Sequence, residues 1–202
     1  MTKRPFLTTA RSVAIFDEMI SCRREYCADT DFFRMTDFWE DQCDDEGRWQ
    51  INKYRSDETE DFKRKAGVIA FDYRVTLSVD EKLMANAKRG CMLSNFILAH
   101  EMGHVALGHH LRSATTKNFQ LFDGPRGMCN LPPTLEELEA NYAGTFLQCG
   151  VALFDSKWSP LDLARRAFTN VEYVRKSQRI VGLEVFQREL VRPKPNLISI
   201  VL

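Results

Sequence analysis

The chain has 202 residues, and its hydrophobic fraction of 44% is ordinary for a globular protein with one sizeable core and a small appended module. Its apolar stretches are short and broken by charge, and the first ten residues lack the apolar block of a secretion signal. We therefore expect no membrane span and a cytoplasmic location. Six scattered cysteines without a Cys-x-x-Cys pair indicate reduced thiols. The 28 basic and 28 acidic residues cancel, although acidic residues concentrate between Asp29 and Asp61 and basic residues follow Ser156.

The first half of the chain predicts one helix and one strand. From Ala10 to about Tyr26, apolar residues recur at helical spacing, which indicates an amphipathic helix packed on the core. The segment from Ala28 to Lys65 shows no clear element boundary. From Phe71 to Val79, apolar and polar residues alternate, and this period of two predicts a single half-buried strand. We expect the exposed side of that strand to hold an extended substrate by strand addition.

A buried helix is predicted from Met92 to His110, because apolar residues fill this segment and no proline interrupts it. Within it the chain reads His100-Glu101-x-x-His104. Residues four apart lie one turn apart on the same face of a helix, so the two histidines can present imidazole nitrogens to one zinc ion. Glu101 is then placed to act on water as a general base. Gly103 is a poor helix former, and its position indicates close approach by a neighbouring backbone.

The remaining histidines and the next helix follow this motif. His109 and His110 lie near the expected end of the same helix, where we interpret them as solvated partners of its dipole. After a connection rich in Thr, Asn, Gly and Pro, Thr134 begins a second helix. Glu137, three residues on, completes a Thr-x-x-Glu capping box.

The third metal ligand must come from outside the histidine motif. A catalytic zinc ion usually takes three protein ligands, and because no histidine remains, the third should be a carboxylate or a thiolate. In the second helix, the capping box accounts for Glu137 and the helix dipole accounts for Glu136. Glu139 has neither role and shares a face with Tyr142 and Phe146, where an unpaired carboxylate would be costly. We therefore predict Glu139 as the third ligand, with Glu136 in reserve.

The C-terminal part predicts two more helices. One follows the cap Ser159-Pro160 and the other follows a capping box from Thr169 to Glu172, with Gly182 ending or kinking the second. Their basic residues fit either a solvated helical pair or a docking surface. We divide the chain into a domain at residues 1–155 and a helical segment at residues 156–202, which can equally be integral to the same domain.

Two motifs of the chain are specific when taken together. The first is His100-Glu101-Met102-Gly103-His104 with Leu107-Gly108-His109, and the second is Glu139-Ala140-Asn141-Tyr142-Ala143 with Phe146-Leu147. Over roughly residues 67–182, the chain resembles the ImmA/IrrE metallopeptidase family. The resemblance implies an α+β fold with a mainly helical, zincin-like core, a small sheet beside the His-Glu-x-x-His helix and a C-terminal segment like a helix-turn-helix. It also implies zinc bound by His100, His104 and Glu139, with Glu101 catalytic.

The predicted function is that of a zinc-dependent endopeptidase. Members of the family cleave or inactivate helix-turn-helix repressors, so the resemblance implies a repressor as substrate and derepression of mobile-element or stress-response genes. We expect Zn²⁺, with another divalent ion such as Mn²⁺ left open, and the donors considered for the carbonyl oxygen are Tyr142, Tyr73 and His109. The chain departs from many relatives at Phe146-Leu147-Gln148-Cys149, where they carry Leu-Leu-Met-Pro, and this departure bears on the shape of the substrate cleft.

Two alternatives from other classes remain open. The protein could sequester a repressor without cutting it, or it could bind DNA while the metal serves a structural purpose. The helices after Ser159 carry suitable basic residues for DNA binding, but the turn at Phe168-Thr169-Asn170 lacks the glycine that is usual in a helix-turn-helix. The basic residues are Arg165, Arg166, Arg175, Lys176 and Arg179.

Overall fold

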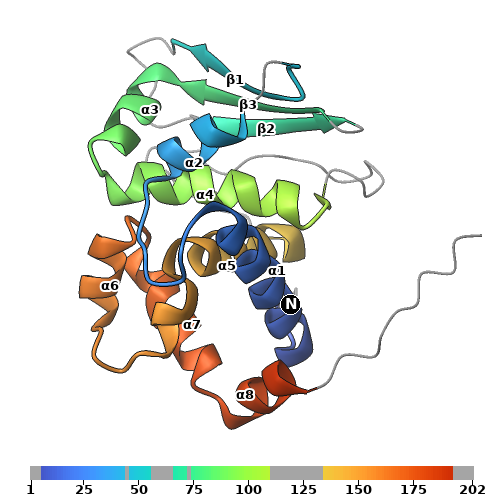
Figure 1. Cartoon of the computed structure of the whole chain (residues 1–202), viewed down its shortest axis with the longest axis vertical. Coiled ribbons are helices and arrows are strands. Elements are labelled where there is room, and N and C mark those ends of the chain that lie inside the picture. Colours follow the sequence, from blue (N-terminus) through green and yellow to red (C-terminus); the bar gives the residue numbers. More distant parts are fainter. Residues whose placement is uncertain (1–5, 44–45, 56–65, 72–73, 110–133, 193–202) are drawn as a thin grey trace, which may run out of the picture.

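A computed structural model describes residues 6–43, 46–55, 66–71, 74–109 and 134–192. It shows an α+β protein in which a three-stranded sheet lies on one side of a mainly helical body (Figure 1). This confirms the expected class and the small sheet, whereas the zincin-like nature of the core stays a prediction. Within the described residues, no helix has both the length and the apolar character needed to cross a membrane.

The sheet contains β1 (Trp49–Tyr54), β2 (Ala66–Phe71) and β3 (Arg74–Asp80). The central strand β3 runs parallel to β1 and antiparallel to β2. The single strand expected from Phe71 to Val79 is therefore wrong, because Phe71 ends one strand and β3 begins at Arg74. Strand addition on β3 is also excluded, since both of its edges are paired within the sheet, and β2 forms an edge instead. The inward side of β3 is buried as the alternation predicts, at Val75, Leu77 and Val79.

Several helices begin at a side chain that accepts hydrogen bonds from free backbone N–H groups of the first turn. Thr8, Asp80, Thr134 and Ser159 act in this way as predicted or as their residue types favour. Asn170, and not Thr169, caps the second C-terminal helix. In chain order the helices are α1 (Thr9–Tyr26), α2 (Met35–Gln42), α3 (Glu81–Lys88), α4 (Met92–Ala106), α5 (Leu135–Cys149), the 3₁₀ helix η2 (Gly150–Phe154), α6 (Pro160–Arg166), α7 (Val171–Val181) and α8 (Glu184–Val191).

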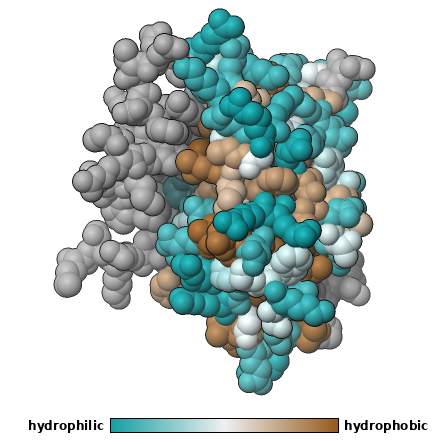
Figure 2. Space-filling view, turned by 90° about the vertical axis from the view of Figure 1, so that its left-hand side faces the viewer, coloured by the Kyte–Doolittle hydropathy of each residue, from teal (hydrophilic) through white to brown (hydrophobic). Residues whose placement is uncertain are grey.

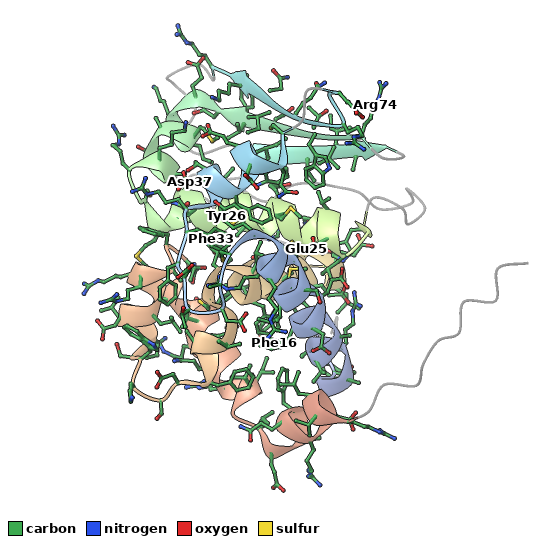
Figure 3. The ribbon with its side chains drawn as sticks, in the orientation of Figure 1. Phe16, Glu25, Tyr26, Phe33, Asp37 and Arg74 are labelled. Atoms are coloured by element: carbon green, nitrogen blue, oxygen red, sulfur yellow. The ribbon has the colours of Figure 1, made fainter. Side chains whose placement is uncertain are left out.

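The helices form successive layers beneath the sheet (Figure 1). α4 lies between the sheet and α5, and α1 packs on α5. Phe16 of α1 points into the lower half of the molecule (Figure 3), where its ring makes edge contacts with Phe146, Phe154 and Phe186. α7 also contacts α5, and α8 contacts α1. The division of the chain at residue 155 stays a prediction.

Apolar residues on the surface are scattered. Figure 2 shows hydrophilic residues over much of one described face, with smaller apolar patches between them. The layers that matter for chemistry are therefore inside the molecule, at the contact between α4 and α5.

Candidate metal centre

The backbones of α4 and α5 touch at two glycines. A Cβ atom placed on Gly103 would lie 2.8 Å from the carbonyl oxygen of Ala140, and one on Gly144 would lie 2.9 Å from the carbonyl carbon of Ala99. Both distances are too short for a real side chain, so only glycine fits at these positions. The close approach predicted for Gly103 is thus confirmed. It brings polar side chains on facing turns of the two helices within reach of one another.

Three of those side chains converge. The Nε2 atoms of His100 and His104 are 3.0 Å apart, and the carboxylate of Glu137 on α5 lies 3.1 Å from the first and 3.5 Å from the second. Among the described residues, these three form a group able to hold a metal ion. Both histidines are almost fully buried. The predicted pair is therefore brought together, and Glu137 joins it from the second helix.

The spacing of the two histidine nitrogens and the Glu137 carboxylate, which faces His100 with Oε2 and His104 with Oε1, fits a tetrahedral zinc ion. Zinc binds imidazole nitrogen and carboxylate oxygen at about 2.0–2.2 Å, so neighbouring ligand atoms in a tetrahedron lie about 3.3–3.5 Å apart. The observed separations of 3.0, 3.1 and 3.5 Å lie close to that edge length. Two imidazoles and one carboxylate also form a donor set that is common at catalytic zinc, which leaves a fourth position for water or substrate.

Asn141 orients the first histidine. It lies one helical turn beyond Glu137 on α5, and its Oδ1 is 3.1 Å from Nδ1 of His100. Its side-chain amide also donates to the carbonyl oxygen of Glu137 at 2.7 Å. With Oδ1 as the acceptor, Nδ1 of His100 carries the proton and Nε2 is left unprotonated, as metal binding requires.

The structure does not bring Glu139 to the histidine pair. Its carboxylate lies 2.8 and 2.6 Å from the guanidinium of Arg11 on α1, and 3.0 Å from Nε2 of His109. The physical reason is the rotation of α5: residues 137 and 141 face α4, whereas residue 139 is turned about 200° around the helix axis from residue 137. Glu136 is half-buried and is not in the metal-binding group either.

His109 was interpreted as solvated, and this is wrong. It is 2% exposed, and its Nδ1 lies 2.8 Å from Nδ1 of His104. α4 ends at Ala106, earlier than expected, and Gly108 adopts a positive φ of 62° that turns the chain back. His110 and Tyr73 lie outside the described residues. Tyr142 is buried with its ring edge-on to Tyr173, and its role as a donor stays a prediction.

Glu101 is an unusual buried acid. It is 2% exposed, and its Oε2 has no hydrogen-bond partner among the described residues. Burial raises the pKa of its carboxyl group to about 7, although the nearby His104 and a hydrogen bond from the backbone of Val68 on β2 oppose the rise. A carboxyl group with this pKa can both accept and return a proton near neutral pH.

Glu137 has the opposite behaviour. Burial acts to raise the pKa of its carboxyl group, but interactions with the His100 and His104 imidazoles outweigh burial and hold the pKa well below its ordinary value. The group therefore stays ionised at neutral pH. Glu137 thus stays ionised, as a metal ligand must, whereas Glu101 can exchange a proton, as a general base must.

Comparison of the chain with protein-family models, with curated proteins and with solved structures gives no match. The resemblance to the ImmA/IrrE family accordingly stays a prediction, and the geometry of the site carries the functional argument. Sequence reasoning missed Glu137, Asn141 and His109. The first two are four residues apart, and this shared helical face was the signal that could have found them.

Proposed function

We propose that the protein is a metal-dependent endopeptidase whose zinc ligands are His100, His104 and Glu137. The observation that carries the proposal is the convergence of two buried histidines and the partly buried Glu137 beside Glu101, a buried carboxyl group with one oxygen unpaired among the described residues. Structural zinc sites are usually closed by a fourth side chain, whereas catalytic sites keep three protein ligands. Glu137 replaces Glu139 as the proposed third ligand.

Zinc bound by this group would supply Lewis acidity, lowering the pKa of a water molecule to about 7 and polarising a carbonyl oxygen. Glu101 would take the proton from the attacking water and later return it to the leaving amine. Its pKa of about 7 suits both transfers. Asn141 keeps His100 in the tautomer that leaves Nε2 free of a proton.

The sheet offers a way to hold the substrate. β2 forms an edge of the sheet, packs against α4, and reaches Glu101 through the backbone of Val68. An extended peptide can add to such an edge by main-chain hydrogen bonds. A peptide paired with β2 would lie beside the base, and this supports a protein substrate. The proposed substrate is a helix-turn-helix repressor.

Ligand assignment is tested with two matched glutamates of α5. Glu137→Gln removes a ligand oxygen, whereas Glu139→Gln changes a buried carboxylate that the metal does not touch. In a chelator competition assay, we expect wild-type protein to hold one zinc ion per chain, the Glu139 variant to keep the ion with weakened affinity, and the Glu137 variant to lose it. The reverse order of affinities would return the ligand role to Glu139.

Catalysis is tested with Glu101→Gln and candidate repressors encoded beside the gene. Metal-loaded wild-type protein should cut its repressor at a site that mass spectrometry can map. The variant should keep one zinc ion and lose cleavage by at least about 100-fold, because general acid–base catalysis contributes about that much or more. Cleavage by the variant at the wild-type rate would refute the role of Glu101.

A regulatory role without cleavage is the second candidate. In the turn between α6 and α7, Phe168 adopts a positive φ of 52°, the conformation that glycine normally supplies in a helix-turn-helix. Arg175 and Arg179 are exposed on α7. Salt-dependent binding of duplex DNA by the full chain, lost in Arg175→Glu, would favour this function. A stable complex with intact repressor would instead indicate sequestration.

A further inference from the structure

We propose that His109 is a positioning residue for the metal centre, fixing His104 through a buried chain of hydrogen bonds that continues to Glu139 and Arg11. This inference rests on the proposed function and deepens it. The chain joins Nδ1 of His104 to Nδ1 of His109 at 2.8 Å, and Nε2 of His109 to Glu139 at 3.0 Å. Arg11 closes it with two contacts to the same carboxylate.

Metal binding sets the direction of every hydrogen in the chain. His104 faces Glu137 and His100 with Nε2, so this nitrogen must be unprotonated when it binds a metal, and Nδ1 must carry the proton. Nδ1 then donates to Nδ1 of His109. His109 in turn donates from Nε2 to Glu139. Each group in the chain thus has the partner that its protonation requires.

Burial strengthens this chain of hydrogen bonds. His104, His109 and Glu139 are each 2–3% exposed, so their interactions are poorly screened by water. A buried carboxylate without a partner would be costly, and Arg11 balances the charge of Glu139 from α1. The result is a carboxylate acting on a metal-binding histidine through one intervening imidazole. Such partners orient the ligand and increase its basicity.

The local backbone is shaped for this contact. On a continued helix, residue 109 would lie about 140° around the axis from residue 104, so the two side chains would diverge. The helix instead ends at Ala106, and the positive φ of Gly108 turns the chain so that His109 returns to His104. The pairing of His109 with His104 therefore depends on the turn at Gly108.

The two metal histidines consequently have different partners. Nδ1 of His100 meets the neutral amide of Asn141, whereas Nδ1 of His104 meets an imidazole backed by an ionised carboxylate. His104 is thus the metal-binding histidine whose Nδ1 is linked, through His109, to a carboxylate.

Three substitutions of His109 separate positioning from packing. Asn keeps an acceptor near the position of Nδ1 and so can still pair with His104. Gln keeps a donor near the position of Nε2 and pairs only with Glu139. Leu fills the space and makes neither hydrogen bond. Thr145→Val is the matched control, because that buried hydroxyl donates to the carbonyl oxygen of Asn141 within its own helix, and no other bond of it is seen among the described residues.

The readouts are zinc affinity by competition with a chromogenic chelator and the visible spectrum of the cobalt-substituted protein, with far-UV circular dichroism confirming the fold of each variant. His109→Leu and His109→Gln should bind zinc about 10- to 100-fold more weakly than wild type and shift the cobalt spectrum, as loss of a ligand's hydrogen-bond partner typically does. His109→Asn should recover affinity to within about threefold of wild type, and Thr145→Val should match wild type.

The outcomes separate this inference from the proposed function. Wild-type protein that binds no zinc would overturn both. Tight zinc binding by wild type together with equal affinity in His109→Leu would overturn only the positioning role. Equal weakening by Leu and Asn would also overturn it, because an acceptor near the position of Nδ1 would then restore nothing. Recovery by Asn alone supports the hydrogen bond that His104 donates to residue 109.

Discussion

Gly103→Ala tests whether the contact of α4 with α5 sets the geometry of the metal centre. The new Cβ would lie 2.8 Å from the carbonyl oxygen of Ala140, 3.1 Å from its Cα and 3.0 Å from the Cβ of Ala143. None of these atoms is the movable end of a long side chain. The helices must therefore separate, and restoring an ordinary contact of at least 3.4 Å from 2.8 Å requires about 0.6 Å.

The two effects of the substitution can be compared in size. Overpacking costs about 1–3 kcal/mol, while alanine in place of glycine within a helix contributes about 1 kcal/mol of stability. Because the contacts are with backbone, the cost should lie in the upper half of its range. We expect a net loss of about 1–2 kcal/mol in the free energy of unfolding, which corresponds to a fall in Tm of about 2–8 °C for a chain of this size.

The effect on the metal should be larger than the effect on stability. Metal sites tolerate errors of about 0.2 Å in ligand distances, and a 0.6 Å separation moves Glu137 away from His100 and His104 by more than that. Zinc affinity should fall at least about tenfold, or 1.4 kcal/mol. Gly67→Ala is the control, because a Cβ there meets nothing within 4 Å.

The assays are urea unfolding of the metal-free proteins and zinc competition with a chelator. Gly103→Ala should lose both stability and affinity, and Gly67→Ala should lose neither. A Gly103 variant as stable as wild type with unchanged zinc affinity would refute the reasoning, since helix propensity would then decide the outcome and the two backbones would not be in contact.

Two further predictions concern buried charges. Arg23→Met should lower the free energy of unfolding by about 2–4 kcal/mol in urea titrations, because the fully buried guanidinium donates to the carbonyl oxygens of Leu147 and Gln148 and would leave them unpaired; the exposed neighbour Arg24→Met should leave the midpoint unchanged. In metal-free protein, the raised pKa of Glu101 makes its ionised form costly in the folded state, so its contribution to stability should fall by about 3 kcal/mol as pH rises from 4.5 to 7. Urea unfolding at pH 5 and pH 8 should show this loss in wild type relative to Glu101→Gln, and identical pH dependence in the two proteins would contradict it.

The sequence was sufficient to place the histidine motif, because the motif depends only on residues that lie close together along one helix. Spacing on one helix determines that His100 and His104 share a face, and the apolar neighbours determine that the helix is buried. The N-terminal helix and the caps at Thr134 and Ser159 are equally local and are confirmed. These features need no knowledge of how helices pack.

The third ligand could not be chosen in that way. α5 is buried on every side from Glu139 to Cys149, so apolar periodicity does not reveal which face meets α4. The hydroxyl of Thr134 accepts a hydrogen bond from the backbone N–H of Glu137, as the capping box predicts, but the Glu137 carboxylate turns to the histidines. The capping box assigns the side chain of Glu137 to the start of α5, whereas the structure places it beside the histidines. The rotation of α5 is decided by the glycine contacts, which are tertiary.

The strands show the same limit. Alternation correctly assigned the buried residues of β3, but the division into β2 and β3 and the pairing with β1 depend on partners far apart in sequence. β1 and α2 lie in the acidic segment where no element was predicted. Phe33 and Phe38 of this segment pack on the core against Tyr26 of α1, and Figure 3 shows Phe33 beside Tyr26. Burial of these aromatic residues orders a segment whose acidic composition alone does not predict an element.

α1 holds α5 at both ends by arginine side chains that differ in chemistry. Near its start, Arg11 binds the carboxylate of Glu139, and near its end, Arg23 donates to the final carbonyl oxygens of α5. Glu137 reaches the histidines only in one rotation of α5. Because Arg11 and Arg23 hold α5 at both ends, they fix that rotation before the metal binds. The metal centre therefore depends on α1, which contributes none of the three proposed ligands, and the contacts of the partly exposed Arg11 and the buried Arg23 pre-organise it.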